Sequence, residues 1–181
     1  MKLNLPNKLT LLRIILVPVY LLCLWFFREG MQPLLALTVF AVASLTDMLD
    51  GKIARKYNLI TNFGKFMDPI ADKLLTHTAF IMLLAMGRLN VVSCMIMIAR
   101  EFVVSGLRLV AVEQGRVIAA GMTGKVKTVL QMLLVCFLTL WLEMPAFRML
   151  TAALEVAAVA MTLISMIEYV YQNRSVLDGA R

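Results

Sequence analysis

The residues best suited to chemistry lie in one short stretch, where four aspartates occur in an otherwise apolar chain. They are Asp47, Asp50, Asp68 and Asp72. Asp47 and Asp50 are three residues apart, and Asp68 and Asp72 are four residues apart. If each segment is helical, the two aspartates of each pair lie on one face of their helix. If the two faces oppose each other, four carboxylates converge, and their mutual repulsion calls for a bound cation. The spacing therefore predicts a divalent-metal site.

The type of ligand favours a hard cation. Carboxylate oxygens with no His or Cys nearby suit Mg²⁺ first and Mn²⁺ next, and protein-bound Mg²⁺ usually also binds phosphates of a substrate. Gly51 and Ala54 lie on the face of Asp47 and Asp50 and leave room for a nucleotide or diphosphate, and Arg55 adds positive charge beside it. The alternative is that the aspartates are ordinary solvated helix ends, which would leave this combination of residues unexplained.

Composition places the chain in a membrane. It has 181 residues, of which 61% are hydrophobic, and a mean hydropathy of +0.86, so a soluble fold would have too little polar surface to cover its core. Because no linker rich in Ser, Pro or Gly divides it, we expect a single integral-membrane domain over residues 1–181. Lys2 and Lys8 precede an apolar run with no small-residue cleavage site, so this run is expected to remain as the first span.

The apolar runs and their breakers predict an all-α, polytopic membrane protein with six transmembrane helices. The expected spans are about 7–27, 32–56, from between 64 and 68 to 87, 90–112, from 119 or 125 to 142, and 146–171. Several spans must carry charges at one end, because the uncharged runs alone are shorter than the roughly 18 residues of a clear span. Pro69 either opens the third helix, with Asp68 as its N-cap, or lies inside a helix that begins earlier.

Basic residues are unevenly distributed over the two sides of this layout. The fourteen on the side of both termini are Lys2, Lys8, Arg13, Lys52, Arg55, Lys56, Lys65, Lys73, Arg108, Arg116, Lys125, Lys127, Arg174 and Arg181. Only Arg28, Arg88 and Arg148 fall on the other side, and Arg100 lies within a span. Because basic segments stay in the cytoplasm, we expect both termini and the acidic site to face the cytoplasm.

A second group of charged residues occurs along the fourth span and around the start of the fifth. It comprises Arg100, Arg108, Arg116, Lys125 and Lys127. Cations near lipid are costly and usually functional, and an anionic phosphate is their natural partner. We therefore expect a phosphate site here. The alternative is that these cations only orient the protein in the membrane or bind lipid headgroups.

The acidic stretch resembles the motif of the CDP-alcohol phosphotransferase family. Its pattern, Asp47-x2-Asp50-Gly51-x2-Ala54-Arg55-x8-Gly64-x3-Asp68-x3-Asp72, matches that motif at every defined position. The resemblance implies the family's helical membrane fold. It also implies an enzyme that cleaves the diphosphate of a CDP-linked donor, joins the phosphoryl-bearing part to an alcohol and releases CMP.

Other segments are similar to bacterial members of this family that make phosphatidylglycerophosphate from CDP-diacylglycerol and sn-glycerol 3-phosphate. These segments are Pro6 to Arg13, Arg100 to Phe102, Ser105 to Arg108, and Gly124 to Thr128. An acceptor that bears a phosphate accounts for cations that serine or choline would not need. Inositol phosphate would need them too, so charge alone leaves that acceptor open.

The resemblance also implies roles for single residues. Two Mg²⁺ ions, or Mn²⁺ in their place, would be held by Asp47, Asp50, Asp68 and Asp72, and Asp72 would also be the catalytic base. CDP-diacylglycerol would be bound by Asn7, Thr10, Gly51, Ala54, Arg55 and Thr61. The acceptor phosphate would be bound by Arg108, Lys125 and Lys127.

Membrane lipid and a second copy of the chain are the expected partners, with no nucleic acid. Small residues at 41–44 permit close helix contact in such a homodimer, and the resemblance implies the bacterial cytoplasmic, or inner, membrane. Family members that make phosphatidylserine, phosphatidylinositol phosphate or cardiolipin share every aspartate and remain alternatives. A Mg²⁺ transporter with intramembrane carboxylates is the non-enzymatic alternative.

The remaining polar and sulfur-containing residues are expected to be structural. Cys23, Cys94 and Cys136 lie in apolar runs without metal-ligand spacing, so we expect them to pack rather than to bind zinc or form disulfides. His77 is expected to pack between helices. Glu155, in the sixth span, has no assigned role, and Arg148 is a candidate partner about two turns earlier.

Overall fold

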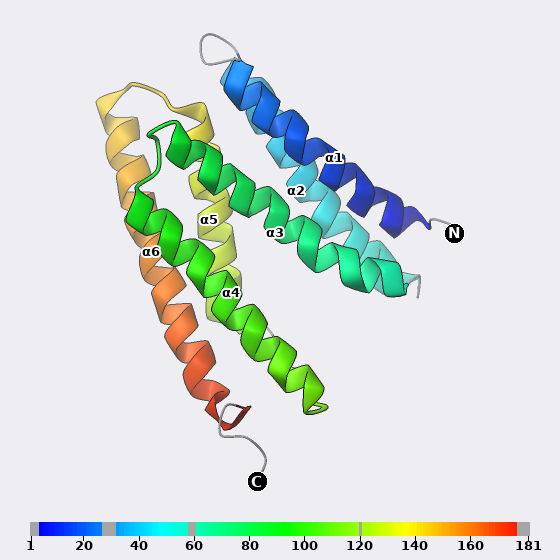
Figure 1. Cartoon of the computed structure of the whole chain (residues 1–181). Coiled ribbons are helices and arrows are strands. Elements are labelled where there is room, and N and C mark those ends of the chain that lie inside the picture. The colour runs from blue at the N-terminus through cyan, green and yellow to red at the C-terminus, as the bar shows by residue number, and fades with distance from the viewer. Residues whose placement is uncertain (1–3, 27–31, 58–60, 120, 177–181) are drawn as a thin grey trace. The chain divides into compact units, whose positions relative to one another are not determined.

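The protein is helical throughout its ordered elements in a computed structural model (Figure 1). The structure describes residues 4–26, 32–57, 61–119 and 121–176; within these ranges the side chains of residues 32, 47–56, 62, 63, 65, 66, 68, 69 and 72 lie outside the description. The elements are α1 (Leu5–Phe26), α2 (Gln32–Lys56), α3 (Asn62–Ala85), α4 (Val91–Glu113), α5 (Met122–Leu140), α6 (Pro145–Gln172) and the short 3-10 helix η1 (Arg174–Val176). This confirms the predicted all-helical architecture.

Each of the six α-helices coincides with a predicted span. Within the described residues, α1, α5 and α6 are long and apolar enough to cross a membrane, and α2 and α3 contain the shorter apolar stretches Pro33–Thr46 and Lys73–Ala85. Large apolar side chains such as Ile15, Met149 and Ile167 are exposed, as contact with lipid requires. The chain is a membrane protein, and the crossing of all six helices stays a prediction.

The helices form two compact units. The first contains residues 1–88 and the end of α5 with its following residue, Leu138–Trp141, and the second contains Leu89–Phe137 and Leu142–Arg181. Each unit has its own buried side chains, and the prediction of one domain over the whole chain is not tested by this division.

In the first unit, α1 packs against α2 and α3, and α2 also contacts α3. Tyr20 of α1 lies with its ring centroid 5.4 Å from that of Phe40 in α2, and its hydroxyl shares a buried 2.9 Å hydrogen bond with the hydroxyl of Thr139. Ala36 and Ala43 of α2 are fully buried, because small residues let helix backbones approach closely. Ala43 belongs to the small-residue segment expected to permit a homodimer contact; it is buried within the chain, whereas Val42 of the same segment is exposed.

The start of α3 is fixed by a capping hydroxyl. Thr61 has an extended backbone, and its Oγ1 accepts a 3.0 Å hydrogen bond from the backbone N–H of Gly64. This side chain satisfies one of the unpaired N–H groups of the first turn, so the helix begins at Asn62, before the expected range of 64 to 68. Pro69 therefore lies inside a helix that begins earlier, and Asp68 is not the N-cap.

The second unit is built on α4 and α6, which run in the same direction with α5 opposed to them (Figure 1). Its core contains Val104, Leu107 and Ala111 of α4, Tyr169 of α6 and Val176 of η1. The end of α4 is tied to η1, since the Gln114 side chain donates to the Val176 carbonyl at 3.0 Å.

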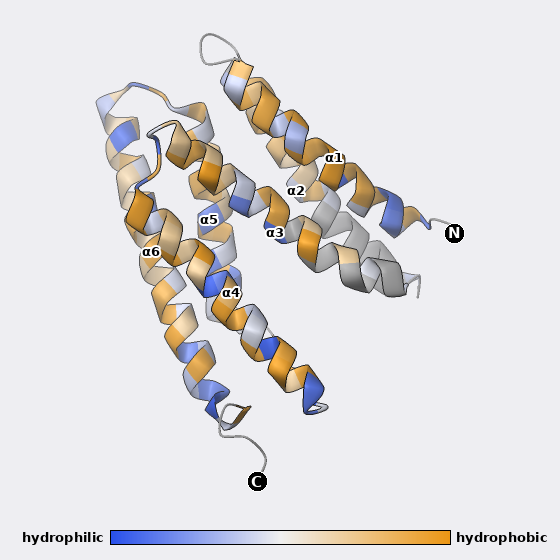
Figure 2. Ribbon diagram, in the orientation of Figure 1, coloured by the Kyte–Doolittle hydropathy of each residue, from blue (hydrophilic) through white to orange (hydrophobic). Residues whose placement is uncertain are grey.

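Hydrophilic residues concentrate towards particular helix ends. Figure 2 shows them near the N-terminal end of α1, and near the C-terminal ends of α4 and α6, while most of the rest of α1 is hydrophobic. This is the pattern of helices whose ends lie near the membrane surface.

Glu155 has a structural role that the sequence did not reveal. Its Oε1 accepts a 3.3 Å hydrogen bond from the backbone N–H of Asn90, while the Asn90 side chain accepts a 2.8 Å hydrogen bond from the N–H of Val92. Both interactions lie at the N-terminus of α4, where a carboxylate is stabilised by the helix dipole. Glu155 thus attaches α6 to the start of α4.

Candidate functional site

The predicted acidic site lies on two helices that touch each other. Asp47 and Asp50 occur near the end of α2, Asp68 and Asp72 occur in the first turns of α3, and the two helices contact each other in the first unit. The side chains of these aspartates lie outside the described residues, as do those of Gly51, Ala54 and Arg55 in the same stretch. Their convergence, and the base assigned to Asp72, stay predictions.

The backbone nevertheless fits the predicted metal ligands. Both segments are continuous α-helix, so the spacings of three and four residues keep Asp47 with Asp50, and Asp68 with Asp72, on one face of each helix. The four donors are all carboxylates, which suits Mg²⁺ or Mn²⁺. Among the described side chains, no other group of three His, Cys, Asp or Glu residues could hold a metal ion.

Two of the predicted donor-binding residues lie side by side. The Thr61 hydroxyl donates a 3.0 Å hydrogen bond to Oδ1 of Asn7 while it caps α3. Asn7 is almost fully buried, and so is Thr10, whose hydroxyl donates to the Pro6 carbonyl at 3.1 Å. These contacts attach the start of α1 to the start of the helix that carries Asp68 and Asp72.

Arg13 occupies an unusual position for a charged residue. Its side chain is fully buried in α1, although the sequence suggested only an orienting role in the membrane. A buried guanidinium within a membrane helix is expected to be functional. The signal was available in the segment Pro6 to Arg13, which resembles the corresponding family segment.

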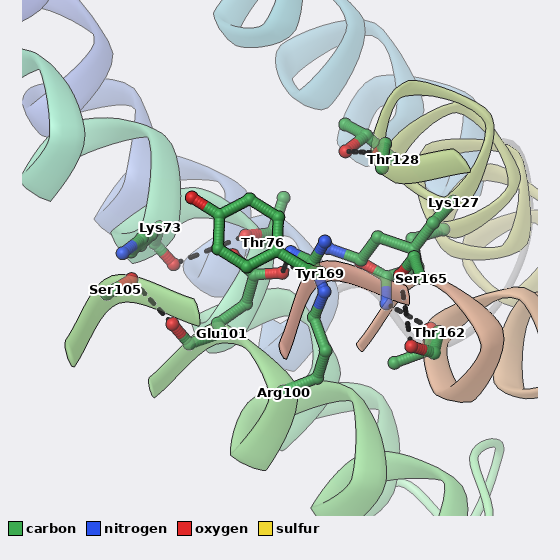
Figure 3. Close-up of polar contacts among 12 residues, drawn as sticks. Lys73, Thr76, Arg100, Glu101, Ser105, Lys127, Thr128, Thr162, Ser165 and Tyr169 are labelled. Atoms are coloured by element: carbon green, nitrogen blue, oxygen red, sulfur yellow. Dashed lines mark hydrogen bonds and ion pairs between the residues drawn. The ribbon is translucent and has the colours of Figure 1, made fainter. Parts of the chain in front are cut away.

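In the second unit, one carboxylate holds two buried cations (Figure 3). Oε1 of Glu101 accepts a 2.9 Å hydrogen bond from Nη1 of Arg100 and forms a second ion pair with Nζ of Lys127 in α5. Arg100 and Lys127 are both buried, so water screens these charges little and the pairs are stronger than surface ion pairs.

Arg108 is held by a different helix. Its Nε donates a 2.9 Å hydrogen bond to the hydroxyl of Tyr169, and its Cζ lies 5.5 Å from the centroid of the same ring. Tyr169 is buried in α6, so the guanidinium is fixed by both a hydrogen bond and a cation–π contact.

These two arginines line one small pocket of the second unit. Its lining residues are Arg100, Arg108, Gly121, Thr123, Gly124, Ser165, Glu168, Tyr169 and Gln172. The pocket has a volume of about 20 Å³, which holds about one water molecule. On one edge Gln172 donates a 2.9 Å hydrogen bond to Glu168 in an exposed position.

The predicted acceptor-phosphate residues divide into three environments. Arg108 lines the pocket, Lys127 is paired with Glu101, and Lys125 is exposed on the first turns of α5 and is not among the lining residues. Arg100 also lines the pocket; the sequence placed it in the cation group expected to bind phosphate, but not among the acceptor-phosphate ligands. Its spacing of eight residues from Arg108 places both on one side of α4, which is the signal that could have identified it.

Comparisons with known proteins identify the family of the chain. Residues 3–166 match the family described as CDP-alcohol phosphatidyltransferase. The chain is 42% identical, over 94% of its length and 95% of the relative's, to the CDP-diacylglycerol--glycerol-3-phosphate 3-phosphatidyltransferase of Bacillus subtilis (strain 168).

Further relatives carry related names. The chain is 44% identical to a protein of Rickettsia felis with the same name, over 76% of this chain and 75% of the relative. It is 37% identical to the probable phosphatidylglycerophosphate synthase of Mycobacterium tuberculosis (strain ATCC 25618 / H37Rv), over 98% of this chain and 85% of the relative. With the family match covering most of the sequence, the chain belongs to the CDP-alcohol phosphatidyltransferase family.

Proposed function

We propose that this chain transfers the phosphatidyl group of CDP-diacylglycerol to sn-glycerol 3-phosphate and releases CMP. The observation that carries this proposal is the 42% identity, over nearly the whole of both chains, to a relative with that named activity. The two arginines of the second unit support it, because an acceptor with a phosphate needs cations that a neutral alcohol does not.

The donor would bind at the acidic ends of α2 and α3. Asp47, Asp50, Asp68 and Asp72 would hold two Mg²⁺ ions, or Mn²⁺, which when bound would stabilise the negative charge of the donor pyrophosphate. The small residues Gly51 and Ala54 would leave room for the nucleotide, with Arg55 beside its phosphates. Asn7, Thr10 and Thr61 would complete this site where α1 meets α3.

The reaction would be a direct displacement at phosphorus. Asp72 would take the proton from the 1-hydroxyl of glycerol 3-phosphate as its oxygen attacks the phosphorus that bears diacylglycerol. The bond from that phosphorus to the bridging oxygen would break, and CMP would leave with the bond's electron pair. Arg108, with Arg100 beside it, would hold the acceptor phosphate, and Lys125 would guide the anion from the surface.

The proposed membrane location, orientation and oligomeric state are supported by the same family assignment. We propose that the protein lies in the bacterial cytoplasmic membrane with both termini and the acidic site facing the cytoplasm, where the soluble acceptor is available. The bias of basic residues towards that side supports this orientation. We also propose a homodimer, whose contact would use residues other than the buried Ala43.

An acceptor panel tests the proposal. Purified protein in mixed micelles with CDP-diacylglycerol and Mg²⁺ would be given radiolabelled glycerol 3-phosphate, serine, inositol phosphate or phosphatidylglycerol. We expect equimolar CMP and transfer of label into the lipid phase with glycerol 3-phosphate, no CMP with the other three acceptors, and no lipid-soluble label from the water-soluble serine and inositol phosphate. Turnover of another acceptor in preference to glycerol 3-phosphate would reject the assigned substrate, and Mg²⁺ flux into vesicles without CMP release would reject the enzyme.

A further inference from the structure

Glu101 forms ion pairs with both Arg100 and Lys127. Both cations bind the same oxygen, Oε1, and they come from different helices, α4 and α5. A side chain that faces two buried cations compensates part of their charge and also fixes their direction. The consequence for the pocket depends on which of the two cations reaches it.

Arg100 reaches the pocket and Lys127 does not. Arg100 is among the lining residues, and Lys127 is absent from them. The distal Nη2 of Arg100 lies against α5 at Gly124, where a Cβ atom would be 3.4 Å from it. Glycine at this position therefore gives the guanidinium direct access to the helix backbone.

One atom of Arg100 still lacks an acceptor. Its Nε is buried and, among the described residues, has no hydrogen-bond partner. A buried N–H without a partner is costly, and a bound anion with several oxygens would satisfy it. Glu101 is hydrogen-bonded to Nη1 of the guanidinium and not to Nε, so it leaves Nε for such a ligand.

We propose that Glu101 is a positioning residue for acceptor binding: together with Lys127 it fixes Arg100 so that the guanidinium presents its remaining donors to the acceptor phosphate. This inference rests on the proposed function. It changes the expected role of Lys127, which anchors Glu101 from α5 instead of binding the phosphate itself. The side chain of Glu101 touches neither substrate nor reacting atoms and acts through Arg100.

The test compares four variants by steady-state kinetics and by thermal unfolding in detergent. They are Glu101→Gln, Lys127→Met, the double variant with both changes, and the control Glu113→Gln, which removes an exposed carboxylate from the same helix. CMP release is measured while either glycerol 3-phosphate or CDP-diacylglycerol is varied, so that the KM for each substrate is separated from kcat.

Glu101→Gln should raise the KM for glycerol 3-phosphate about ten- to hundredfold, the range for losing a charge-assisted hydrogen bond. The KM for CDP-diacylglycerol should stay within about twofold of wild type, as should all constants of the control, because the donor site has not been altered. Lys127→Met should raise the acceptor KM by less than about threefold, since Glu101 still holds Arg100.

The double variant separates positioning from stability. Each single variant leaves one charge of the Glu101–Lys127 pair without its partner, which should lower the unfolding temperature. The double variant removes both charges of the pair, so its unfolding temperature should be close to that of wild type. Its KM for glycerol 3-phosphate should stay high, because Arg100 no longer has the Glu101 carboxylate to hold it. Recovery of the acceptor KM together with stability would overturn the inference, because it would show a structural role only. A Lys127→Met effect as large as that of Glu101→Gln would also overturn it, because Lys127 would then bind the phosphate directly.

Failure of the proposed function can be distinguished from failure of the Glu101 inference. If wild-type protein uses another acceptor, the same comparison is made with that acceptor. The inference stands if that acceptor carries a phosphate and only its KM rises in Glu101→Gln. It fails with the proposed function if the acceptor has no phosphate.

Discussion

Arg108 and Tyr169 are linked by a hydrogen bond from Nε to the phenol oxygen at 2.9 Å, across 61 residues of sequence. The ring of the same tyrosine lies 5.5 Å from Cζ of the arginine. Tyr169 thereby engages Nε of Arg108, and both residues line the pocket of the second unit. The C-terminal helix of the chain thus sets the direction of a cation on α4.

Tyr169→Phe should weaken acceptor binding with little effect on folding. The substitution removes the hydrogen bond and keeps the ring, so we expect the KM for glycerol 3-phosphate to rise about tenfold, as for loss of a bond to a charged group, with kcat nearly unchanged. Tyr171→Phe is the matched control, because Tyr171 is exposed on the same helix. Equal kinetics for the two variants would show that the Tyr169 hydroxyl does not position Arg108.

Thr61→Val should destabilise the first unit. It removes the hydroxyl that caps α3 and donates to Asn7, so the free energy of unfolding should fall by about 1 to 2 kcal/mol. Thr61→Ser keeps the hydroxyl and should retain most of that stability. Denaturant titration in detergent measures both values, and a loss as large in Thr61→Ser as in Thr61→Val would show that the hydrogen bonds of the hydroxyl do not account for the stability.

The Arg88 side chain caps the C-terminus of α5. Its Nη1 donates to the carbonyls of Leu138 and Thr139 at 3.3 and 3.2 Å, and its Cζ lies 5.4 Å from the ring centroid of Trp141. A cation at a helix C-terminus satisfies unpaired carbonyls and complements the dipole. Arg88→Gln should therefore lower the unfolding free energy by about 1 kcal/mol.

The same Arg88 variant should leave kcat and both KM values of the folded protein unchanged, because Arg88 is assigned to no substrate. Unfolding is followed by circular dichroism, and turnover is measured at a temperature at which both proteins are folded. A large fall in kcat with unchanged stability would contradict the capping role.

Asp72→Asn should abolish turnover without unfolding the protein. The amide cannot accept the hydroxyl proton, so kcat should fall by about 10²-fold or more, while the unfolding temperature stays close to that of wild type. Glu113→Gln serves as the control for removal of an exposed carboxylate. Turnover near the wild-type rate in Asp72→Asn would exclude this residue as the base.

Much of the fold followed from the apolar pattern, and the exceptions have local causes. All six helices coincide with the expected spans to within a few residues, and α3 begins early because the Thr61 hydroxyl caps it, a contact that hydropathy does not report. Glu155 was left without a role because its partner is the backbone N–H of Asn90, 65 residues away. The spacing of polar residues in the sequence does not reveal a hydrogen bond from a distant backbone N–H group to a side chain.

The candidate site was predictable where its residues are close in sequence. The aspartates form a local motif, and the family assignment that rests on it is confirmed. The pairing of Glu101 with Lys127, 26 residues later, could not be predicted from the sequence, because it depends on how α4 and α5 pack. Arg100 was placed in the cation group but not among the acceptor-phosphate ligands, because its contact with the pocket also depends on how the helices pack.

We propose that carboxylates on α2 and α3 bind the metal ions that in turn bind the pyrophosphate of the donor. Anomalous diffraction from crystals grown with Mn²⁺ and CDP-diacylglycerol tests it most directly. We predict two anomalous peaks at about 2.0 to 2.2 Å, typical of such metal–oxygen bonds, from carboxylate oxygens of Asp47, Asp50, Asp68 and Asp72, with the pyrophosphate bound to the same ions. Bound CDP-diacylglycerol with no anomalous peak at these four aspartates would contradict the account.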